Sequence, residues 1–168
     1  RAAVQVELRN LEDNSLIPVM DRLNQMVCRD TKDNMFVTLV LAVLEPHTRQ
    51  LTYVNAGHIQ PVYWSPASGH KRLESGGCFF GIMPGTPYEQ ESIELEPSSS
   101  VAFFTDGITD ALNERDEMFG VERLEKLITQ SSEISSSHLC SLLLDEISAF
   151  RGNRNVFDDL TMLMVRSI

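Results

Sequence analysis

Two short acidic stretches of this sequence could bring carboxylates to one common site. The first is Asp106-Gly107, which follows the apolar run 101–104, and the second is Asp158-Asp159, which precedes another apolar run. A buried strand that ends in Asp-Gly presents one carboxylate at the edge of its sheet, and Gly107 would allow a sharp turn there. If the two strands are neighbours, the carboxylates of Asp106 and Asp158 converge.

Asp106-Gly107 also has a plainer interpretation, a turn that closes a β-hairpin, because Asp-Gly is a common turn dipeptide. The second acidic stretch, Asp158-Asp159, favours a carboxylate site over a hairpin turn, because its side chains could converge with Asp106. Oxygen ligands without His or Cys select hard cations such as magnesium or manganese, and two such ions about 3.5–4 Å apart can aim a hydroxide at phosphorus. The pattern predicts that Asp106 and Asp158 hold a divalent cation.

Length and composition limit the classes of protein to consider. A chain of 168 residues with 42% hydrophobic content suits one domain with a real core. The net charge of -10 argues against nucleic acid or an anionic membrane as the main partner. Three separated cysteines predict neither a disulfide framework nor a zinc site, as is typical of a reducing, cytoplasmic compartment. No apolar run approaches the roughly 20 residues of a membrane span, and we expect no targeting segment.

Apolar spacing and turn residues predict the elements that would position these side chains. An amphipathic helix is expected over 16–28, with Ser15 as its N-cap and Pro18 in its first turn. The first dozen residues fit the tail of a helix better than a strand. Strands are expected at 36–44, 51–56 and 61–64 as an antiparallel meander, then at 88–95 (an edge strand), 101–105 and 160–165.

The remaining segments are a loop and two helices. Four glycines and a proline make 76–85 a loop lying over the core, and two helices are expected around 119–128 and over 138–150, with the serines at 135–137 capping the second. Strands in a run, then two helices, then a strand predict an α+β arrangement with helices packed on antiparallel sheets.

Several motifs, in this order, resemble the SpoIIE-like branch of the PPM metal-dependent protein serine/threonine phosphatases. They are Asn24, the Phe-Val-Thr-Leu strand at 36–39, Asn-Ala-Gly-His at 55–58, Phe-Thr-Asp-Gly-Ile-Thr-Asp-Ala at 104–111, Phe-Gly-Val-Glu-Arg-Leu at 119–124 and Asp-Asp-Leu-Thr at 158–161. Each motif alone is weak. Their shared order and spacing, from about residue 20 to the end, make the resemblance specific.

The resemblance implies a β-sandwich of two antiparallel sheets flanked by helices, with a site for two manganese or magnesium ions at one end. By position, Asp106, Gly107 and Asp158 would belong to the metal site. Asp159 would support the metal ligands without binding the metal itself, or would have only a structural role. His58 would lie at the rim of the site, although a turn histidine satisfied by the backbone is an equally good interpretation.

The chain departs from the family pattern at two places. The turn before the Asp106 strand, usually Pro-Gly-Asp, is Pro-Ser-Ser at 97–99, which should change only a hairpin tip. More seriously, residues 1–35 contain no match to the Asp-x-x-Gly-His-Gly segment whose Asp bridges the two metals in relatives. We therefore expect residues 1–168 to be one phosphatase domain without its N-terminal strands. Alone it would be inactive, and its uncovered sheet edges would favour a homodimer.

The implied function is hydrolysis of phosphoserine or phosphothreonine on a regulatory protein, such as an anti-sigma-factor antagonist. An upstream sensor or receiver domain in the parent chain would control it. A metal-activated hydroxide would attack the phosphorus without a phosphoenzyme. The alternative is a noncatalytic interaction or dimerisation module that keeps the fold. A phospho-accepting receiver is excluded. A receiver has its acidic pair near the N-terminus and a lysine near the end, whereas here Asp158-Asp159 comes last and no such lysine follows.

Overall fold

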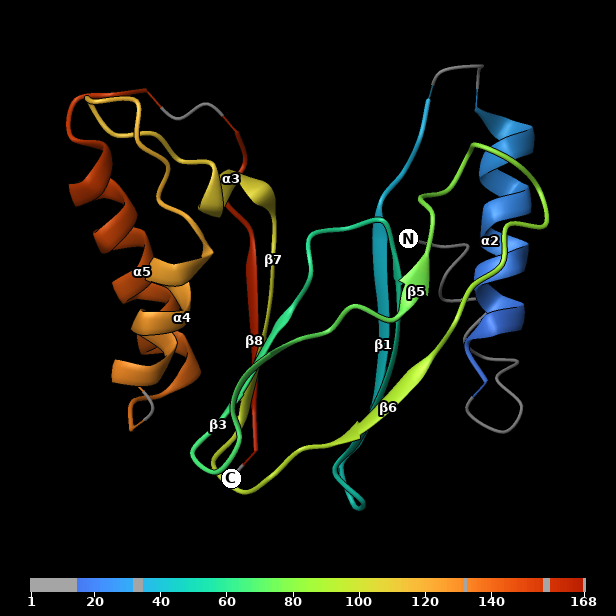
Figure 1. Cartoon of the computed structure of the whole chain (residues 1–168), viewed down its shortest axis with the longest axis horizontal. Coiled ribbons are helices and arrows are strands. Elements are labelled where there is room, and N and C mark those ends of the chain that lie inside the picture. The colour runs from blue at the N-terminus through green and yellow to red at the C-terminus, as the bar shows by residue number, and fades with distance from the viewer. Residues whose placement is uncertain (1–14, 32–34, 132, 156–157, 168) are drawn as a thin grey trace. The chain divides into compact units, whose positions relative to one another are not determined.

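The structure is a computed structural model that describes residues 15–31, 35–131, 133–155 and 158–167 (Figure 1). Its contacts divide the chain into two compact units. The first unit comprises Arg1–His58 and Glu74–Leu95, and the second comprises Ile59–Leu73 and Glu96–Ile168. Each unit is built around its own sheet. The helix tail expected in the first dozen residues lies outside the described residues.

The first unit has a four-stranded sheet centred on β2. Strands β1 (Leu39–Glu45) and β2 (Gln50–Ala56) form an antiparallel hairpin. Strand β6 (Glu91–Glu94) pairs antiparallel with β2, and the two-residue strand β5 (Gly76–Gly77) pairs parallel with its end. The segment 76–85 is otherwise a loop, as predicted, and its Phe80 lies in the core of this unit.

Helix α2 (Ile17–Asp30) packs on this sheet through the predicted apolar stripe. Its buried Val19, Met20 and Leu23 join residues from β1 and β2 in one core cluster. Full burial of one such side chain contributes about 1.5–3 kcal/mol. The predicted cap at Ser15 is wrong, because Leu16 is the N-cap and no side chain caps the helix from that position. The Leu16 amide instead donates to Gln90 Oε1 at 2.8 Å.

The second unit has an antiparallel sheet in the order β4-β3-β7-β8. Its strands are β3 (Val62–Ser65), β4 (Gly69–Arg72), β7 (Ser100–Phe104) and β8 (Met162–Arg166). Helices α4 (Val121–Gln130) and α5 (Ser136–Arg151) supply apolar side chains to the same core as β3, β7 and β8. Ser135 caps α5 by accepting from the His138 amide, which confirms the predicted serine cap.

The observed strands differ from the predicted ones at several places. The meander is wrong beyond its first hairpin: β3 pairs with β4 and β7, because the left-handed Gly57 and the following loop separate it from β2. Strand β4 was not predicted, since its sequence Gly-His-Lys-Arg is polar. The strand expected from residue 36 begins at Leu39, and Val37 makes only an isolated bridge to Phe80.

The α+β class, with two sheets flanked by helices, is confirmed. The pairing is antiparallel throughout the described strands except between β2 and β5. Within the described ranges, no helix has both the length and the apolar character that a membrane crossing requires.

Candidate functional site

The strands that carry the two acidic stretches are hydrogen-bonded neighbours, as predicted. Strands β7 and β8 pair antiparallel with Phe104 opposite Met162, so the end of β7 meets the start of β8. Thr105 extends this contact: its Oγ1 donates to the Asp159 carbonyl at 2.9 Å and accepts from the Thr161 amide at 3.1 Å. The Thr105 amide donates to the Thr161 carbonyl at 3.1 Å. These bonds hold the residues beside Asp106 and Asp158 together.

Gly107 packs directly against the second acidic stretch. A Cβ built at Gly107 would lie 2.5 Å from the Asp159 carbonyl oxygen and 3.4 Å from Asp158 Cβ. Such a contact cannot form without displacing backbone, so only glycine fits here. The sequence-based reason for this glycine was wrong. Gly107 lies in the short helix α3 (Asp106–Thr109) rather than at a sharp turn, and close approach of two backbones is what requires it.

Both candidate carboxylates are exposed, Asp106 at the start of a helix and Asp158 in the loop before β8. Asp106 is the first residue of α3, with Thr105 as N-cap, so the interpretation of Asp-Gly as a hairpin turn is wrong. Asp158 lies before β8, and its Oδ1 accepts from the Asp159 amide at 2.7 Å. This local bond engages one oxygen of the Asp158 carboxylate, and no bond to the second oxygen is found among the described residues.

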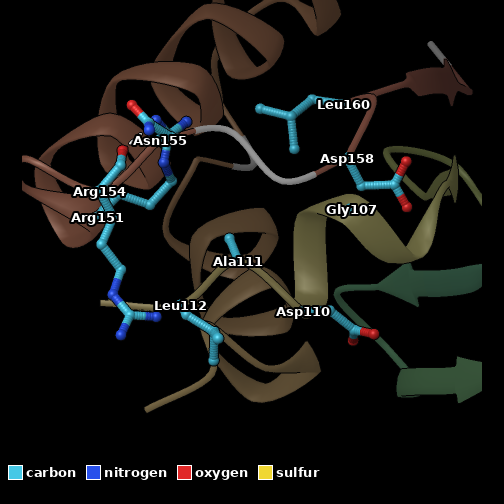
Figure 2. Close-up of a pocket in the computed structure, with 9 residues that line it drawn as sticks. All are labelled: Gly107, Asp110, Ala111, Leu112, Arg151, Arg154, Asn155, Asp158 and Leu160. Carbon is cyan, nitrogen blue, oxygen red and sulfur yellow. Dashed lines mark hydrogen bonds between the residues drawn. The ribbon is translucent and has the colours of Figure 1, made fainter. Parts of the chain in front are cut away.

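A cavity of about 530 Å³ within the second unit is lined by Asp158 and Gly107, while Asp106 is not among the described residues that line it. Figure 2 shows Asp158 above Gly107 on one side of the view and the arginines on the other. The described residues that line it are Gly107, Asp110, Ala111, Leu112, Arg151, Arg154, Asn155, Asp158 and Leu160.

Sequence reasoning assigned no role to four polar residues of this cavity: Asp110, Arg151, Arg154 and Asn155. Asp110 had a usable signal, because it follows Asp106 by one helical turn and residues at that spacing share a helix face. The other three had none. They lie at the end of α5 and in the loop after it, and nothing in their spacing relates them to residues 107–112.

His58 belongs to the first unit and is held in a closed turn. Its amide donates to Asn55 Oδ1 at 2.8 Å, and Asn55 Nδ2 donates to the His58 carbonyl at 3.0 Å. Its ring Nδ1 lies 3.0 Å from Thr38 Oγ1. His58 is thus a turn residue, but its ring contacts the Thr38 hydroxyl rather than a backbone group, and a place for it at the rim of a metal site stays a prediction.

The donors in the second unit suit a hard cation only in part. Asp106 and Asp158 offer carboxylate oxygens, the ligands that magnesium and manganese prefer. Among the described residues, however, no group of three His, Cys, Asp or Glu side chains gathers closely enough to hold a metal ion. Asp159 contributes through its backbone, whose carbonyl anchors Thr105. Metal binding by Asp106 and Asp158 therefore stays a prediction.

Sequence comparisons find a matching family profile and two related proteins. The family profile described as Stage II sporulation protein E (SpoIIE) matches residues 2–167. Protein IcfG of Synechocystis sp. is 33% identical over 132 residues, which cover 78% of this chain and 20% of IcfG. Phosphoserine phosphatase RsbU of Bacillus subtilis is 27% identical over 168 residues, covering 97% of this chain and 49% of RsbU. The chain thus spans half or less of the length of these relatives.

Solved structures share the fold. The SiaA-PP2C domain of Pseudomonas aeruginosa matches with a TM-score of 0.83 at 18% identity, over 98% of this chain and 66% of that one. The phosphatase domain of SpoIIE from Bacillus subtilis, presoaked with manganese, matches with a TM-score of 0.65 at 14% identity, over 98% of this chain and 73% of that one. The solved structures share the fold, and the profile match over nearly the whole chain shows that the chain belongs to the Stage II sporulation protein E (SpoIIE) family.

Proposed function

We propose that this chain hydrolyses phosphoserine or phosphothreonine on a regulatory protein, such as an anti-sigma-factor antagonist, using manganese or magnesium ions. The observation that carries the proposal is the close packing of Gly107 on the Asp158-Asp159 backbone, which sets Asp106 and Asp158 at the same end of β7 and β8. The names of RsbU, a phosphoserine phosphatase, and of the manganese-soaked SpoIIE domain support the substrate class and the metal.

Asp106 and Asp158 would hold a cation at this end of the β7–β8 pair. When bound, divalent cations neutralise phosphoryl charge and make a water molecule more acidic. The chain's own residues position the ligands: the Thr105 hydroxyl clamps the Asp159 carbonyl, and the Asp159 amide orients the Asp158 carboxylate. Gly107 leaves room for this approach.

We further propose that residues 1–168 form one domain and that the complete site takes two ions. The bridging carboxylate that the family resemblance implies is matched by no segment of residues 1–35. A version of the chain extended upstream is therefore the appropriate protein for an activity assay. We also propose two partners: an upstream sensor or receiver domain in the parent chain, and a second copy of this chain in a homodimer.

The test is manganese-dependent release of phosphate from a phosphoserine protein and from a generic phosphate ester. Asp106→Asn and Asp158→Asn should each lower activity by more than about 100-fold, because even residues that only support metal ligands contribute about 10–100-fold. Asp145→Asn, an exposed carboxylate on α5, is the matched control and should retain wild-type activity. Wild-type turnover in Asp106→Asn would end the assignment. No turnover in any version would favour the noncatalytic module.

A further inference from the structure

The first unit carries an apolar patch that the candidate metal site does not explain. Eight large apolar side chains are exposed among the described residues, and five of them lie on two neighbouring segments of this unit: Met35, Phe36, Val37, Ile82 and Met83. These five residues are called the apolar patch below. The carboxylates of Asp106 and Asp158 belong to the second unit, so metal binding gives no reason for it.

The two segments of the apolar patch are held side by side. The Val37 amide donates to the Phe80 carbonyl at 3.0 Å, and the Phe80 amide donates to the Val37 carbonyl at 2.8 Å. The rings of Phe36 and Phe79 pack against each other with their centroids 4.7 Å apart. The side chains at 35–37 and at 82–83 therefore lie on one region of the surface, although they are far apart in the sequence.

Buried Asn24 of α2 anchors the second segment. Its Nδ2 donates to the Met83 carbonyl at 2.9 Å, and its Oδ1 accepts from the Gly81 amide at 3.1 Å. The Thr86 hydroxyl also donates to the Met83 carbonyl, at 2.8 Å. The exposed side chains of Ile82 and Met83 are thus carried by an anchored backbone. A surface fixed in this way loses less entropy when a partner binds.

The apolar patch lies in the least charged part of the chain. Residues 35–44 and 75–88 contain no Asp, Glu, Lys or Arg, although 23% of the chain is charged. The cores of protein interfaces show the same depletion of charge and the same enrichment in Met and Phe. Two copies of a chain with a net charge of -10 repel each other, and an uncharged face is where that repulsion opposes contact least.

The exposed area of the apolar patch is enough for a small dimer contact. At about 200 Å² for a large side chain, five residues that are 43–61% exposed present about 500 Å² together. Two such patches packed on each other bury about 1,000 Å², the lower limit for a specific interface. A two-fold axis brings the same surface of both copies together, so apolar side chains meet apolar side chains.

From these observations we infer that the apolar patch is the contact face of a homodimer, in which the patches of two copies pack on each other about a two-fold axis. The inference rests on the homodimer proposed above and assigns its contact to this patch instead of to sheet edges. The contact is small, so the dissociation constant should be on the order of micromolar. Dimerisation uses neither Asp106 nor Asp158 and does not depend on hydrolysis.

The experiment is sedimentation velocity of the chain and of its upstream-extended version, at concentrations from about 1 to 100 μM. Both should associate as the concentration rises. Ile82→Glu and Phe36→Glu, one on each segment, should each weaken the dimer by more than about 100-fold, because like charges would be brought together at the contact. Leu144→Glu places the same charge at an exposed leucine on α5, in the second unit, and should dimerise like the wild type. Urea unfolding should show that all three variants are folded.

Each outcome decides a separate point. A dimer that persists in Ile82→Glu or Phe36→Glu overturns the assigned face while leaving the homodimer. Equal loss in Leu144→Glu also overturns it, because the effect would then be one of added charge. A dimer of the 168-residue chain that the extended version lacks overturns it too, since the preceding segment would then cover the patch. A chain that stays monomeric ends both the face and the homodimer, whatever the phosphatase assay shows, and a dimer lost only in the two patch variants supports the face even without hydrolysis.

Discussion

At Gly107, one added methyl group would collide with the Asp159 carbonyl oxygen, 2.5 Å from the position of its Cβ. Gly107→Ala should therefore destabilise the chain by about 1–3 kcal/mol, the range for forcing extra bulk into a packed site, and should weaken manganese binding by displacing Asp158. Urea unfolding and manganese titration measure the two effects. Gly69→Ala is the control: Gly69 has a left-handed φ of 74° and open space around it, so alanine there should cost about 1 kcal/mol of backbone strain and leave manganese affinity unchanged.

Two buried tyrosines of the first unit make stability sensitive to alkaline pH. Burial, reinforced by the hydrogen bond from Tyr53 to Glu91 Oε2 at 2.5 Å, raises the pKa of Tyr53 to about 12, and burial raises the pKa of Tyr88 to about 12. Below pH about 10 both hydroxyls keep their protons in the folded and the unfolded chain. Between pH about 10 and 12 only the unfolded chain loses them, so the free energy of unfolding should fall.

Phenylalanine substitutions separate the two tyrosines. Each of Tyr53→Phe and Tyr88→Phe should reduce the alkaline loss of stability, and the double variant should remove most of it. At neutral pH they should differ. Tyr53→Phe loses a hydrogen bond and costs about 1 kcal/mol, whereas the Tyr88 hydroxyl is buried without a partner among the described residues, so its removal should cost nothing. Urea unfolding at neutral and alkaline pH provides the measurement. An equal cost at neutral pH would contradict this account.

At the scale of elements, the junction of β7, α3 and β8 depends on the Thr105 hydroxyl, which bonds both the Asp159 carbonyl and the Thr161 amide. Thr105→Val keeps the shape of the side chain and removes both bonds, so it should cost about 1–3 kcal/mol and expose the Thr161 amide to exchange. Amide hydrogen exchange at Thr161 and urea unfolding test this. Ser141→Ala on the exposed face of α5, where the hydroxyl donates to the Ser137 carbonyl, should cost less and leave Thr161 protected. Unchanged exchange at Thr161 in Thr105→Val would show that β-pairing alone holds the junction.

At the scale of the whole molecule, the described residues hold two candidate ligand carboxylates and no cluster of three. We expect the 168-residue chain to bind manganese weakly, because an ion held mostly by water has little to gain from the protein. Isothermal titration calorimetry and the phosphatase assay should show tighter binding and far higher activity in a version extended upstream. Comparable activity in both would mean that the site has been misplaced.

Much of the architecture and part of the site could be predicted from the sequence, because those features depend on local patterns. The apolar stripe of α2 and the serine cap of α5 follow from the order of neighbouring residues. The apolar runs of β2 and β7 and the two acidic stretches beside strands follow from the same local order. Such signals follow the periods of helices and strands, and tertiary contacts only reinforce them.

Only the tertiary structure decided which distant segments meet. It moved β3 out of the predicted meander into the sheet of β7, and it gave Gly107 its reason, a contact with a carbonyl 52 positions further along the chain, at Asp159. It also joined Arg151 to Asp110 and Leu112 around one cavity. Contacts of this kind depend on side-chain volume and strand register across long separations, and no local period of the sequence encodes either of them.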